Sequence, residues 1–596
     1  MISRMRGLLA VLLTVLVVFT GRLMWLQLAQ AEQYADLSLQ NFVQQQRITP
    51  LRGRILAADG TVLADNRVAY DLMYWGGELD GWSRLRRLLD VEGPPRPPDP
   101  DEPDQVRNGA VVAWNIPDVL VPAVEERVAG QANLYLRERI ERLYPTNLAA
   151  QVVGYTGLAD PARHPGRRVD ELVGMSGLES GLDDTLFGVP GLEMVEVDYR
   201  GVPIDTQELE AALPGADVVT TLDPEVQRAA EDALAGAVRY VNDYRRSQGR
   251  PAVDTTPGAL LAMDLTSGDV LAMASWPTFD QNVFTRRPSD PDAVEAILGD
   301  RDRLPLQNRA IEAFPPASTL KMLTSHTLLQ EGYVSSATRY ACSASVSFGG
   351  ITWRNWATYH RGQYDVAQAI ADSCNTYFWH AAMATPAFGD GWGPFMEAWH
   401  RDGEAFGFGT AVGVDLPGER AGRLPDPAWT REVRDTAWYP GYTLNSVIGQ
   451  GDVLATPLQT LRFAGTLALR GERVEPRLVR AVGGEERPVR RDTVEGRHWA
   501  TLHDGMRRMV TDFGSSEVIG PRAGFGVNVA GKTGTAETSR GEGAEHAWFM
   551  AYAPAEDPQI AVVTFLEHAG SSTATAVPVV RDFLASYFQL PTGDDE

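Results

Sequence analysis

Positive charge, lysine and cysteine are all scarce in this sequence of 596 residues. Acidic side chains outnumber basic ones by 78 to 54, which gives a formal net charge of -24 at pH 7. Nucleic-acid binding depends on clustered Lys and Arg, and no basic stripe follows residue 30, so the composition excludes that class of function. The sequence also lacks internal repeats and a disordered tail, and its length predicts two or three folded domains.

The scarcity of lysine is informative because the few lysines present stand in unusual places. Lysine occurs only at Lys321 and Lys532, and every other one of the 54 basic residues is arginine. Arginine does not lose its proton in proteins, whereas a partly desolvated lysine can act as a base. This property accounts for Lys321. Lys532 is better explained as a compact positive charge that receives a carboxylate beside a strand.

Lys321 lies three residues after Ser318, which follows Pro315-Pro316-Ala317 and precedes an apolar helical pattern. We therefore predict that Ser318 lies at the start of a helix and that Lys321 lies one turn later on the same face, within reach of the serine hydroxyl. A serine needs such a base because its hydroxyl is a weak nucleophile at neutral pH. Ser318 is the predicted nucleophile.

The N-terminus predicts a membrane anchor. Arg4 and Arg6 precede a largely apolar run over residues 7–28, in which Arg22 is the one charged residue. The run would form roughly 33 Å of helix, enough to cross the hydrocarbon core of a bilayer. The positive-inside rule places the N-terminus in the cytoplasm. The chain after the run is therefore predicted to lie on the other side of the membrane. A cleaved signal peptide, with small residues at 29–31, is the alternative.

The rest of the chain divides near residue 215. The first part contains an Asp59-Gly60 turn, predicted to close a hairpin, and a proline-rich loop at 93–101. The second part opens with a strand, a long amphipathic helix and two further strands. We predict an α/β (α+β) protein with these ranges: 1–30, cytoplasmic stub and anchor; 31–215, an elongated mixed domain; 216–257, connecting strand, helix and joint; 258–590, a second large domain; and 591–596, an acidic tail.

Cys342 and Cys374 are the only cysteines. Export to an oxidising compartment would allow a disulfide between them, although the sequence does not fix their separation. Together with His360 they could instead hold zinc, but their spacing matches no pattern of zinc ligands. We favour two free buried thiols, and the disulfide and the metal site remain open as alternatives.

Three short motifs occur in a characteristic order. Fifty-five residues separate Ser318 from Ser373, and 159 separate Ser373 from Lys532. This set resembles the motifs of penicillin-binding proteins and serine β-lactamases. The motifs are Ser318-x-x-Lys321, Ser373-Cys374-Asn375 and Lys532-Thr533-Gly534-Thr535.

The resemblance implies a role for each residue of the third motif. Lys532 and the hydroxyls of Thr533 and Thr535 would receive the terminal carboxylate of a peptide, and Gly534 would keep the strand open to it. The backbone N–H groups of Ser318 and Thr535 would form an oxyanion hole. The glycines near this motif would let a peptide lie against the strand as an added strand.

The resemblance likewise assigns the second motif. Ser373 and Asn375 would complete a proton path to the leaving amine and hold the substrate amide. Seen alone, Ser373 could be a helix cap and Asn375 a turn residue, and the other two motifs argue against that interpretation.

The resemblance extends beyond the three motifs to class B penicillin-binding proteins of the elongation type, with the division type as runner-up. It implies a pedestal domain over 31–215 and a transpeptidase domain with a five-stranded antiparallel sheet flanked by helices. Ala317 departs from the family, which often has glycine there, and Asn147 is a second departure. The stretches that carry this resemblance are Arg52-Gly53-Arg54-Ile55, Gly177-Leu178-Glu179, Ser373-Cys374-Asn375-Thr376-Tyr377-Phe378, Gly449-Gln450-Gly451 and His546-Ala547-Trp548-Phe549.

The implied activity is that of a serine D-Ala-D-Ala transpeptidase without a cofactor, with a possible carboxypeptidase side activity. Ser318 would form an acyl-enzyme with a peptidoglycan stem peptide, release terminal D-Ala and pass the acyl group to the amine of a second stem peptide. β-Lactams would acylate the same serine. The implied partner is a membrane glycan polymerase of the shape, elongation and division family, at the inner membrane. A penicillin-sensing receptor or scaffold that does not turn over is the alternative from another class.

Overall fold

The structure is a computed structural model, and it describes residues 2–30, 43–101, 105, 109–131, 133–169, 171–197, 203–541 and 543–591. The predicted acidic tail, apart from Pro591, lies outside the described residues. The chain forms two compact units, and each contains several segments of sequence. The second unit takes in residues 141–186 as well as everything after 215, so the predicted range 31–215 contributes to both units.

The N-terminal helix α1 (Ile2–Met24) continues into the π-helix η1 (Trp25–Ala29). In the described part of the chain, one helical stretch is long and apolar enough to cross a membrane, Met5–Leu28, with a mean hydropathy of 2.2. The guanidinium of Arg22 lies 4.6 Å from the centre of the Trp25 ring. This stretch agrees with the predicted anchor.

The first unit contains two small assemblies. One is an antiparallel sheet in the order β1-β8-β9. In the other, β3, β4 and β5 pack around an apolar cluster that includes Leu72, Val124 and Leu134. The predicted loop at 93–101 contains no helix or strand. The elements are β1 (Val43–Ile48), β3 (Val62–Tyr74), α3 (Trp82–Leu89), β4 (Ala110–Ile116), η2 (Asp118–Leu120), α5 (Val121–Val128), β5 (Leu134–Leu143), β8 (Gly191–Val197) and β9 (Pro203–Glu210), of which β3 and β5 extend into the second unit.

The predicted hairpin at Asp59-Gly60 is confirmed. Strand β2 (Ile55–Leu56) pairs antiparallel with the start of β3, and Gly60 takes the positive φ of 89° that the turn requires. Strand β10 (Val218–Thr220) runs parallel to β2 and pairs on its other side with β18 (Val479–Val482), which pairs with β19 (Glu485–Glu486). The Arg54 guanidinium bonds Asp217 at 2.6 Å and ties these strands together.

The segment around Gly177-Leu178-Glu179 is held by a buried ion pair. Arg142 Nε lies 2.7 Å from Glu179 Oε1, and both side chains are inaccessible to solvent. Gly177 has a φ of 58°, and a Cβ there would lie 2.5 Å from the Val152 carbonyl oxygen, so only glycine fits. The elements are α6 (Ala150–Val153), β6 (Thr156–Leu158), β7 (Leu172–Gly174), α7 (Gly177–Gly181) and α8 (Asp183–Phe187).

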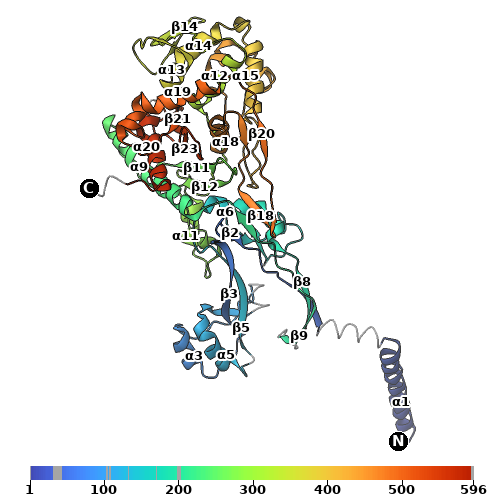
Figure 1. Ribbon diagram of the computed structural model, residues 1–596. Helices are drawn as coiled ribbons and strands as arrows, with labels where there is room; N and C mark the ends of the chain where they lie inside the picture. Colours follow the sequence, from blue (N-terminus) through green and yellow to red (C-terminus); the bar gives the residue numbers. More distant parts are fainter. Residues whose placement is uncertain are drawn as a thin grey trace. The chain divides into compact units, whose positions relative to one another are not determined.

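The second unit is built on a five-stranded antiparallel sheet, as predicted, in the order β12-β11-β23-β22-β21 (Figure 1). The long helix α9 (Pro224–Ser247), capped by the Asp223 carboxylate, also appears where the sequence predicts it. The strands are β11 (Gly258–Asp264), β12 (Val270–Trp276), β21 (Ala530–Ala536), β22 (His546–Ala553) and β23 (Ile560–Leu566).

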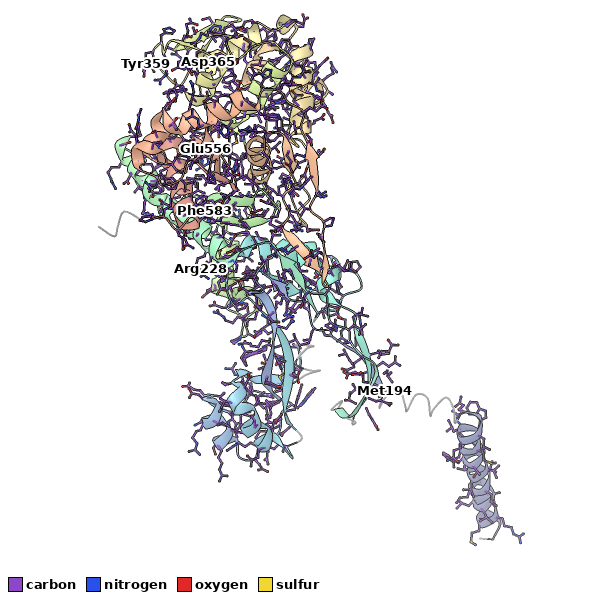
Figure 2. All side chains as sticks on the ribbon, viewed as in Figure 1. Met194, Arg228, Tyr359, Asp365, Glu556 and Phe583 are labelled. Atoms are coloured by element: carbon purple, nitrogen blue, oxygen red, sulfur yellow. A yellow bond between two sulfur atoms is a disulfide. The ribbon has the colours of Figure 1, made fainter. Side chains whose placement is uncertain are left out.

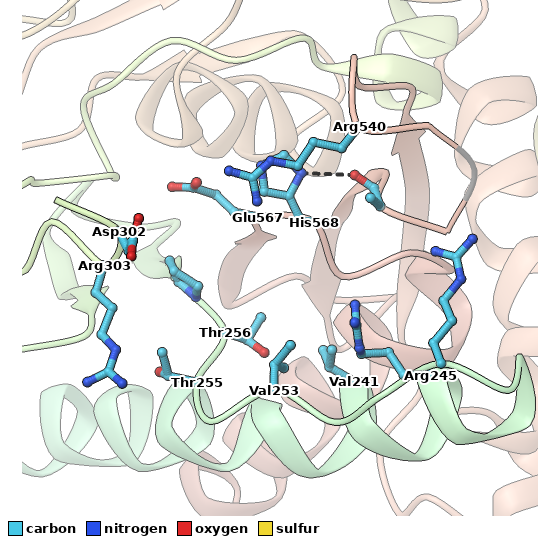
Figure 3. A pocket seen from close by; sticks show the side chains of 13 residues that line it. Val241, Arg245, Val253, Thr255, Thr256, Asp302, Arg303, Arg540, Glu567 and His568 are labelled. Carbon is cyan, nitrogen blue, oxygen red and sulfur yellow. Dashed lines mark hydrogen bonds between the residues drawn. The ribbon is translucent and has the colours of Figure 1, made fainter.

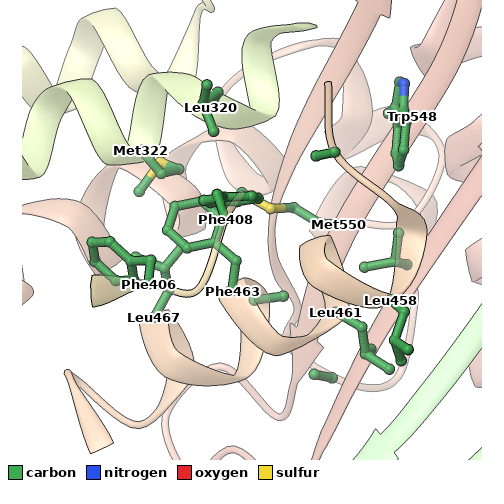
Figure 4. Close-up of a cluster of buried hydrophobic side chains, with 14 of the residues drawn as sticks. Leu320, Met322, Phe406, Phe408, Leu458, Leu461, Phe463, Leu467, Trp548 and Met550 are labelled. Carbon is green, nitrogen blue, oxygen red and sulfur yellow. The ribbon is translucent and has the colours of Figure 1, made fainter. Parts of the chain in front are cut away.

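Both faces of this sheet are buried. Alternate residues of each strand enter different cores: Phe549 packs with α9 and α20 (Ser572–Tyr587), whereas Trp548 and Met550 pack with α18 (Pro457–Ala468) and α12 (Lys321–Gln330). Figure 4 shows the second core, in which Phe463 meets Phe406 and Phe408. Burial on both sides explains why β11, β12, β22 and β23 are largely apolar.

The remaining elements complete the second unit around this sheet. They are α10 (Asn282–Thr285), α11 (Pro291–Leu298), η3 (Ala317–Leu320), β13 (Tyr340–Ala341), β14 (Ser345–Phe348), β15 (Ile351–Arg354), β16 (Gln363–Tyr364), α13 (Val366–Ala371), α14 (Asn375–Met383), η4 (Phe388–Asp390), α15 (Pro394–Ala405), α16 (Pro427–Arg434), α17 (Pro440–Ser446), β17 (Glu472–Val474), β20 (Arg491–Thr493), α19 (Trp499–Thr511), η5 (Gly514–Glu517) and η6 (Pro521–Ala523).

The buried pair of Arg142 and Glu179 allows a test of the fold. Replacing Glu179→Gln leaves the arginine charge buried without its carboxylate, so we expect the free energy of unfolding to fall by about 3–5 kcal/mol. Asp243→Asn, which removes an exposed ion pair with Arg246, is the control and should change it by less than about 1 kcal/mol. Thermal unfolding of the two purified variants measures the difference, and equal losses would contradict the expectation.

Candidate active site

Ser318 lies in the 3₁₀ turn η3, directly before α12, which confirms its prediction at a helix start. Ala317 has a φ of 51°, the left-handed conformation that glycine adopts without cost. Its N–H donates to the Gly449 carbonyl at 2.8 Å, which holds the turn in place. The Ser318 side chain is half-buried and remains accessible to a substrate.

Lys321 is fully buried, and its amine contacts the second motif. Lys321 Nζ donates to the carbonyl of Ser373 at 2.7 Å and to Asn375 Oδ1 at 2.6 Å, and lies 3.2 Å from Ser373 Oγ. Within the described residues, no hydrogen bond joins it to Ser318. Burial, reinforced by the positive charge of Lys532, lowers the pKa of the Lys321 amine far below its usual value, while Asp372 opposes this change.

Ser373 links the two lysines. It lies between α13 and α14 with a φ of 54°, a conformation that non-glycine residues rarely adopt. Its hydroxyl oxygen is 3.2 Å from Lys321 Nζ and accepts a hydrogen bond from Lys532 Nζ at 2.9 Å. The structure therefore joins residues from all three motifs through one hydroxyl group. Cys374, rather than Ser373, occupies the N-cap position of α14, without a capping hydrogen bond from its side chain.

The third motif lies within β21, which is an edge strand of the sheet. Lys532 is fully buried and also donates to the Thr533 carbonyl at 2.9 Å. Burial lowers the pKa of the Lys532 ammonium to about 7, and the Asp372 carboxylate opposes the change. The far side of β21 carries no partner strand among the described residues, so its backbone is available to a peptide.

The glycines of this strand allow close packing, and the expectation that they let a peptide lie against the strand stays a prediction. A Cβ on Gly534 would lie 2.9 Å from the Pro316 carbonyl oxygen and 3.0 Å from Thr319 Cγ2. A Cβ on Gly531 would lie 2.6 Å from the Phe549 ring. Gly534 therefore lets β21 approach the turn that carries Ser318.

Two residues next to Thr535 had no role assigned from the sequence. Thr535 Oγ1 lies 2.8 Å from Ser572 Oγ, and Ser572 in turn donates to the Gly534 carbonyl. Gln450 Nε2 donates to the Thr535 carbonyl at 3.2 Å, and thus reaches β21 from the segment that follows α17. The sequence resemblance includes Gln450 only as part of the Gly449-Gln450-Gly451 stretch.

Cys342 and Cys374 form a disulfide, so the preferred prediction of free thiols was wrong. The fold brings β13 against α14, which places the two sulfurs together in a fully buried position. The bridge also removes both thiols from the alternative zinc site, and the third candidate ligand, His360, is exposed. The described residues contain no cluster of three or more potential metal ligands.

Polar contacts from neighbouring residues hold the second motif in place. Asn355 Oδ1 accepts the N–H of Asn375 at 3.1 Å, and Asn355 Nδ2 lies against both sulfurs of the disulfide. The buried Asp372 carboxylate pairs with Arg361 and accepts the Tyr364 hydroxyl at 2.8 Å. Asn375 is thus held directly by Asn355, and Ser373 is held through its neighbour Asp372.

A cavity of about 430 Å³ lies elsewhere in this unit (Figure 3). Its lining comes from the end of α9, the joint after it, and the loops that follow β21 and β23, and includes Arg245, Arg540 and His568. None of the three motifs contributes to this lining, so the cavity is separate from the site at Ser318.

This arrangement defines an active-site-serine acyltransferase: an accessible serine, a buried amine of low pKa beside it, and an edge strand to position a peptide. A family model described as "Penicillin binding protein transpeptidase domain" matches residues 258–585, and one described as "Penicillin-binding Protein dimerisation domain" matches residues 47–220. The chain belongs to the penicillin-binding protein transpeptidase family, as a class B member of the penicillin-binding protein 2 type.

Individual relatives agree with this assignment. The chain is 28% identical to the peptidoglycan D,D-transpeptidase MrdA of Acinetobacter baumannii, over 97% of this chain and 86% of the relative. It is similar at 41% identity and a TM-score of 0.81 to a solved chain of a peptidoglycan synthase complex that coordinates polymerization and crosslinking, with full coverage of both chains. Pseudomonas aeruginosa penicillin-binding protein 2, solved with WCK 5153, is 27% identical with a TM-score of 0.65, over 91% of this chain and 96% of that one.

The disulfide within the second motif generates a prediction. In the chain-entropy account, closing a loop of this size stabilises a protein by about 3–4 kcal/mol. The variant Cys342→Ser/Cys374→Ser should therefore unfold at a lower temperature and be acylated more slowly by a fluorescent penicillin, because Ser373 and Asn375 lose a tether. Stopped-flow labelling and thermal unfolding measure the two effects. Unchanged acylation would show that the second motif does not need the bridge.

The low pKa of Lys532 predicts a pH dependence of stability. In the unfolded chain this lysine keeps its proton up to about its ordinary pKa of 10.5, whereas in the folded protein it loses the proton above about 7. The unfolded state therefore binds more protons between these values, and this lysine makes stability increase as pH rises through the window. We expect Lys532→Met to reduce that increase between pH 7 and 10 in thermal unfolding. Parallel profiles for the two proteins would contradict the assignment.

Proposed function

We propose that this chain cross-links the stem peptides of peptidoglycan during cell-wall elongation, as a D,D-transpeptidase that works through an acyl-enzyme on Ser318. The observation that carries the proposal is the convergence of Lys321 and Lys532 on the hydroxyl of Ser373, beside a half-buried serine at a helix start. The names of the related MrdA enzymes support the reaction and the substrate.

In the first step, Ser318 Oγ attacks the carbonyl carbon of the D-Ala-D-Ala amide, and its proton passes to the Lys321 amine. Burial favours the neutral form of this amine, which is the form that can accept a proton. The backbone N–H groups of Ser318 and Thr535 stabilise the oxyanion of the tetrahedral intermediate. The C–N bond then breaks, and the leaving amine of D-Ala takes the proton from Lys321 through Ser373.

In the second step, the acyl group moves from Ser318 to the amine of another stem peptide. The incoming amine attacks the ester carbonyl and loses a proton to the same base, and Ser318 Oγ recovers its proton as it leaves. Before D-Ala leaves, Asn375 holds the substrate amide, while Lys532, Thr533 and Thr535 receive the terminal carboxylate of the donor. A β-lactam acylates Ser318 in the same way, but its leaving group stays tethered and blocks the second step.

The place of the reaction follows from the anchor. We propose that residues 1–30 hold the protein in the inner membrane with the N-terminus in the cytoplasm, that 31–215 serve as a pedestal, and that 258–590 catalyse the reaction outside the membrane. The apolar stretch Met5–Leu28 supports the anchor. The related chain in a peptidoglycan synthase complex supports a membrane glycan polymerase as partner.

The role of Lys321 can be tested by a substitution that keeps the charge and removes the base. Arginine does not lose its proton in proteins, so Lys321→Arg should slow acylation by a fluorescent penicillin by about 10²–10⁴-fold. Ser318→Ala should abolish labelling entirely.

Arg246→Lys, on the exposed end of α9, is the control and should label at the rate of the natural protein. Full labelling of Lys321→Arg would overturn the role of this lysine. Rapid labelling without any cross-linked product from uncross-linked peptidoglycan would instead indicate a receptor that does not turn over.

A further inference from the structure

Two large aromatic side chains lie exposed next to the second motif. Trp356 is 56% exposed and Tyr359 is 60% exposed, and both follow the β14–β15 hairpin. Figure 2 shows Tyr359 at the surface of the same part of the second unit as Asp365. Tryptophan and tyrosine are among the residues that most often anchor a binding partner.

These rings are held in fixed positions. The guanidinium of Arg361 lies 5.1 Å from the centre of the Trp356 ring and 5.5 Å from that of Tyr359. Arg361 Nη1 also donates to the Tyr359 hydroxyl at 2.6 Å. Ring surfaces that are fixed before binding lose little conformational entropy when a ligand covers them.

The residues that hold the rings in place also contact the segment that carries the second motif. Arg361 pairs with Asp372, whose side chain is only 3% exposed, and Trp356 Nε1 donates to the Asp372 carbonyl at 3.1 Å. Asp372 directly precedes Ser373, so the aromatic residues contact the backbone segment that carries the second motif. A ligand on these rings would therefore lie beside the peptide that reacts at Ser318.

The surroundings of the rings indicate the chemistry of the ligand. The neighbouring residues Arg354, Thr358 and His360 are exposed and polar, and Ile351 of the hairpin is a further exposed apolar side chain. A stable protein interface needs roughly 1,000 Å² or more with an apolar centre, which two rings and one isoleucine do not supply. A sugar ring presents an apolar C–H face and hydroxyl groups at its edge, and matches flat aromatic rings bordered by hydrogen-bonding groups.

We propose that Trp356, Tyr359 and Arg361 form a sugar-binding platform for the glycan strand that carries a reacting stem peptide. The inference rests on the proposed function, since it assumes a peptidoglycan substrate, and extends recognition from the peptide to the polysaccharide. The platform positions the strand so that its stem peptide lies at the second motif. It predicts that the enzyme distinguishes polymeric substrates from free peptides of identical sequence.

The test compares two substrates in the full-length protein: free stem pentapeptide and uncross-linked glycan strands bearing the same pentapeptide. The readout is the ratio of kcat/KM for cross-linking the two. In Tyr359→Ala we expect the preference for glycan-bearing substrate to fall about tenfold, the size of one lost aromatic contact. Acylation by a fluorescent penicillin should stay within about twofold of the natural protein, since an aromatic contact to sugar is not made with penicillin.

Tyr359→Trp, which restores a ring, is the matched variant and should recover the preference. An unchanged ratio in Tyr359→Ala would overturn the platform, and so would an equal loss on both substrates with slower penicillin acylation, because that pattern indicates a structural role. Trp356→Ala is less decisive, since its indole also supports the Asp372 backbone. Absence of cross-linking by the natural protein on either substrate would count against the proposed function itself.

Discussion

The close approach of an edge strand to a helical turn underlies the active site of this protein. Gly534 of β21 meets the backbone of Pro316 and the side chain of Thr319 at distances that leave no room for a Cβ. This contact packs the strand that carries Thr535 against the turn that carries Ser318. The sheet behind β21 is buried on both faces, and that burial keeps the strand from moving away.

Burial also sets the chemistry of the two lysines. Two ammonium groups cannot both remain charged at low cost in a dry interior where they share one hydroxyl acceptor. Lys321 and Lys532 each lose affinity for protons through desolvation, and the positive charge of Lys532 lowers the pKa of Lys321 further. The negative charge of Asp372 opposes this change in both lysines, and burial raises the pKa of Asp372 itself. The site thus contains an amine that can accept a proton.

The sequence predicted those features that depend on local patterns. The Asp59-Gly60 hairpin, helix α9 with its Asp223 cap, the strands β11 and β12 and the helix start at Ser318 are set by turn chemistry and periodicity, and all were found. The three motifs were recognisable by residue type and order. Their family was therefore evident before the fold was known.

The features that escaped prediction depend on contacts between distant segments. Pairing of Cys342 with Cys374 requires β13 to pack beside α14, which no local pattern specifies. The contact of Lys321 with Asn375, the support from Asn355 and the hydroxyl of Ser572 at Thr535 are likewise tertiary. The close packing of Gly534 against Pro316 is tertiary as well, because spacing along the sequence does not reveal that these two residues meet.

The complete burial of both lysines has a consequence for the reactivity of the protein. The described part of the folded chain exposes no lysine amine to reagents in solution, because Lys321 and Lys532 are 0% exposed. Acylating agents and aldehydes that modify proteins through surface amines find their ordinary targets missing here. Covalent capture of a lysine in the native protein would accordingly report that one of the two active-site lysines has become exposed to solvent.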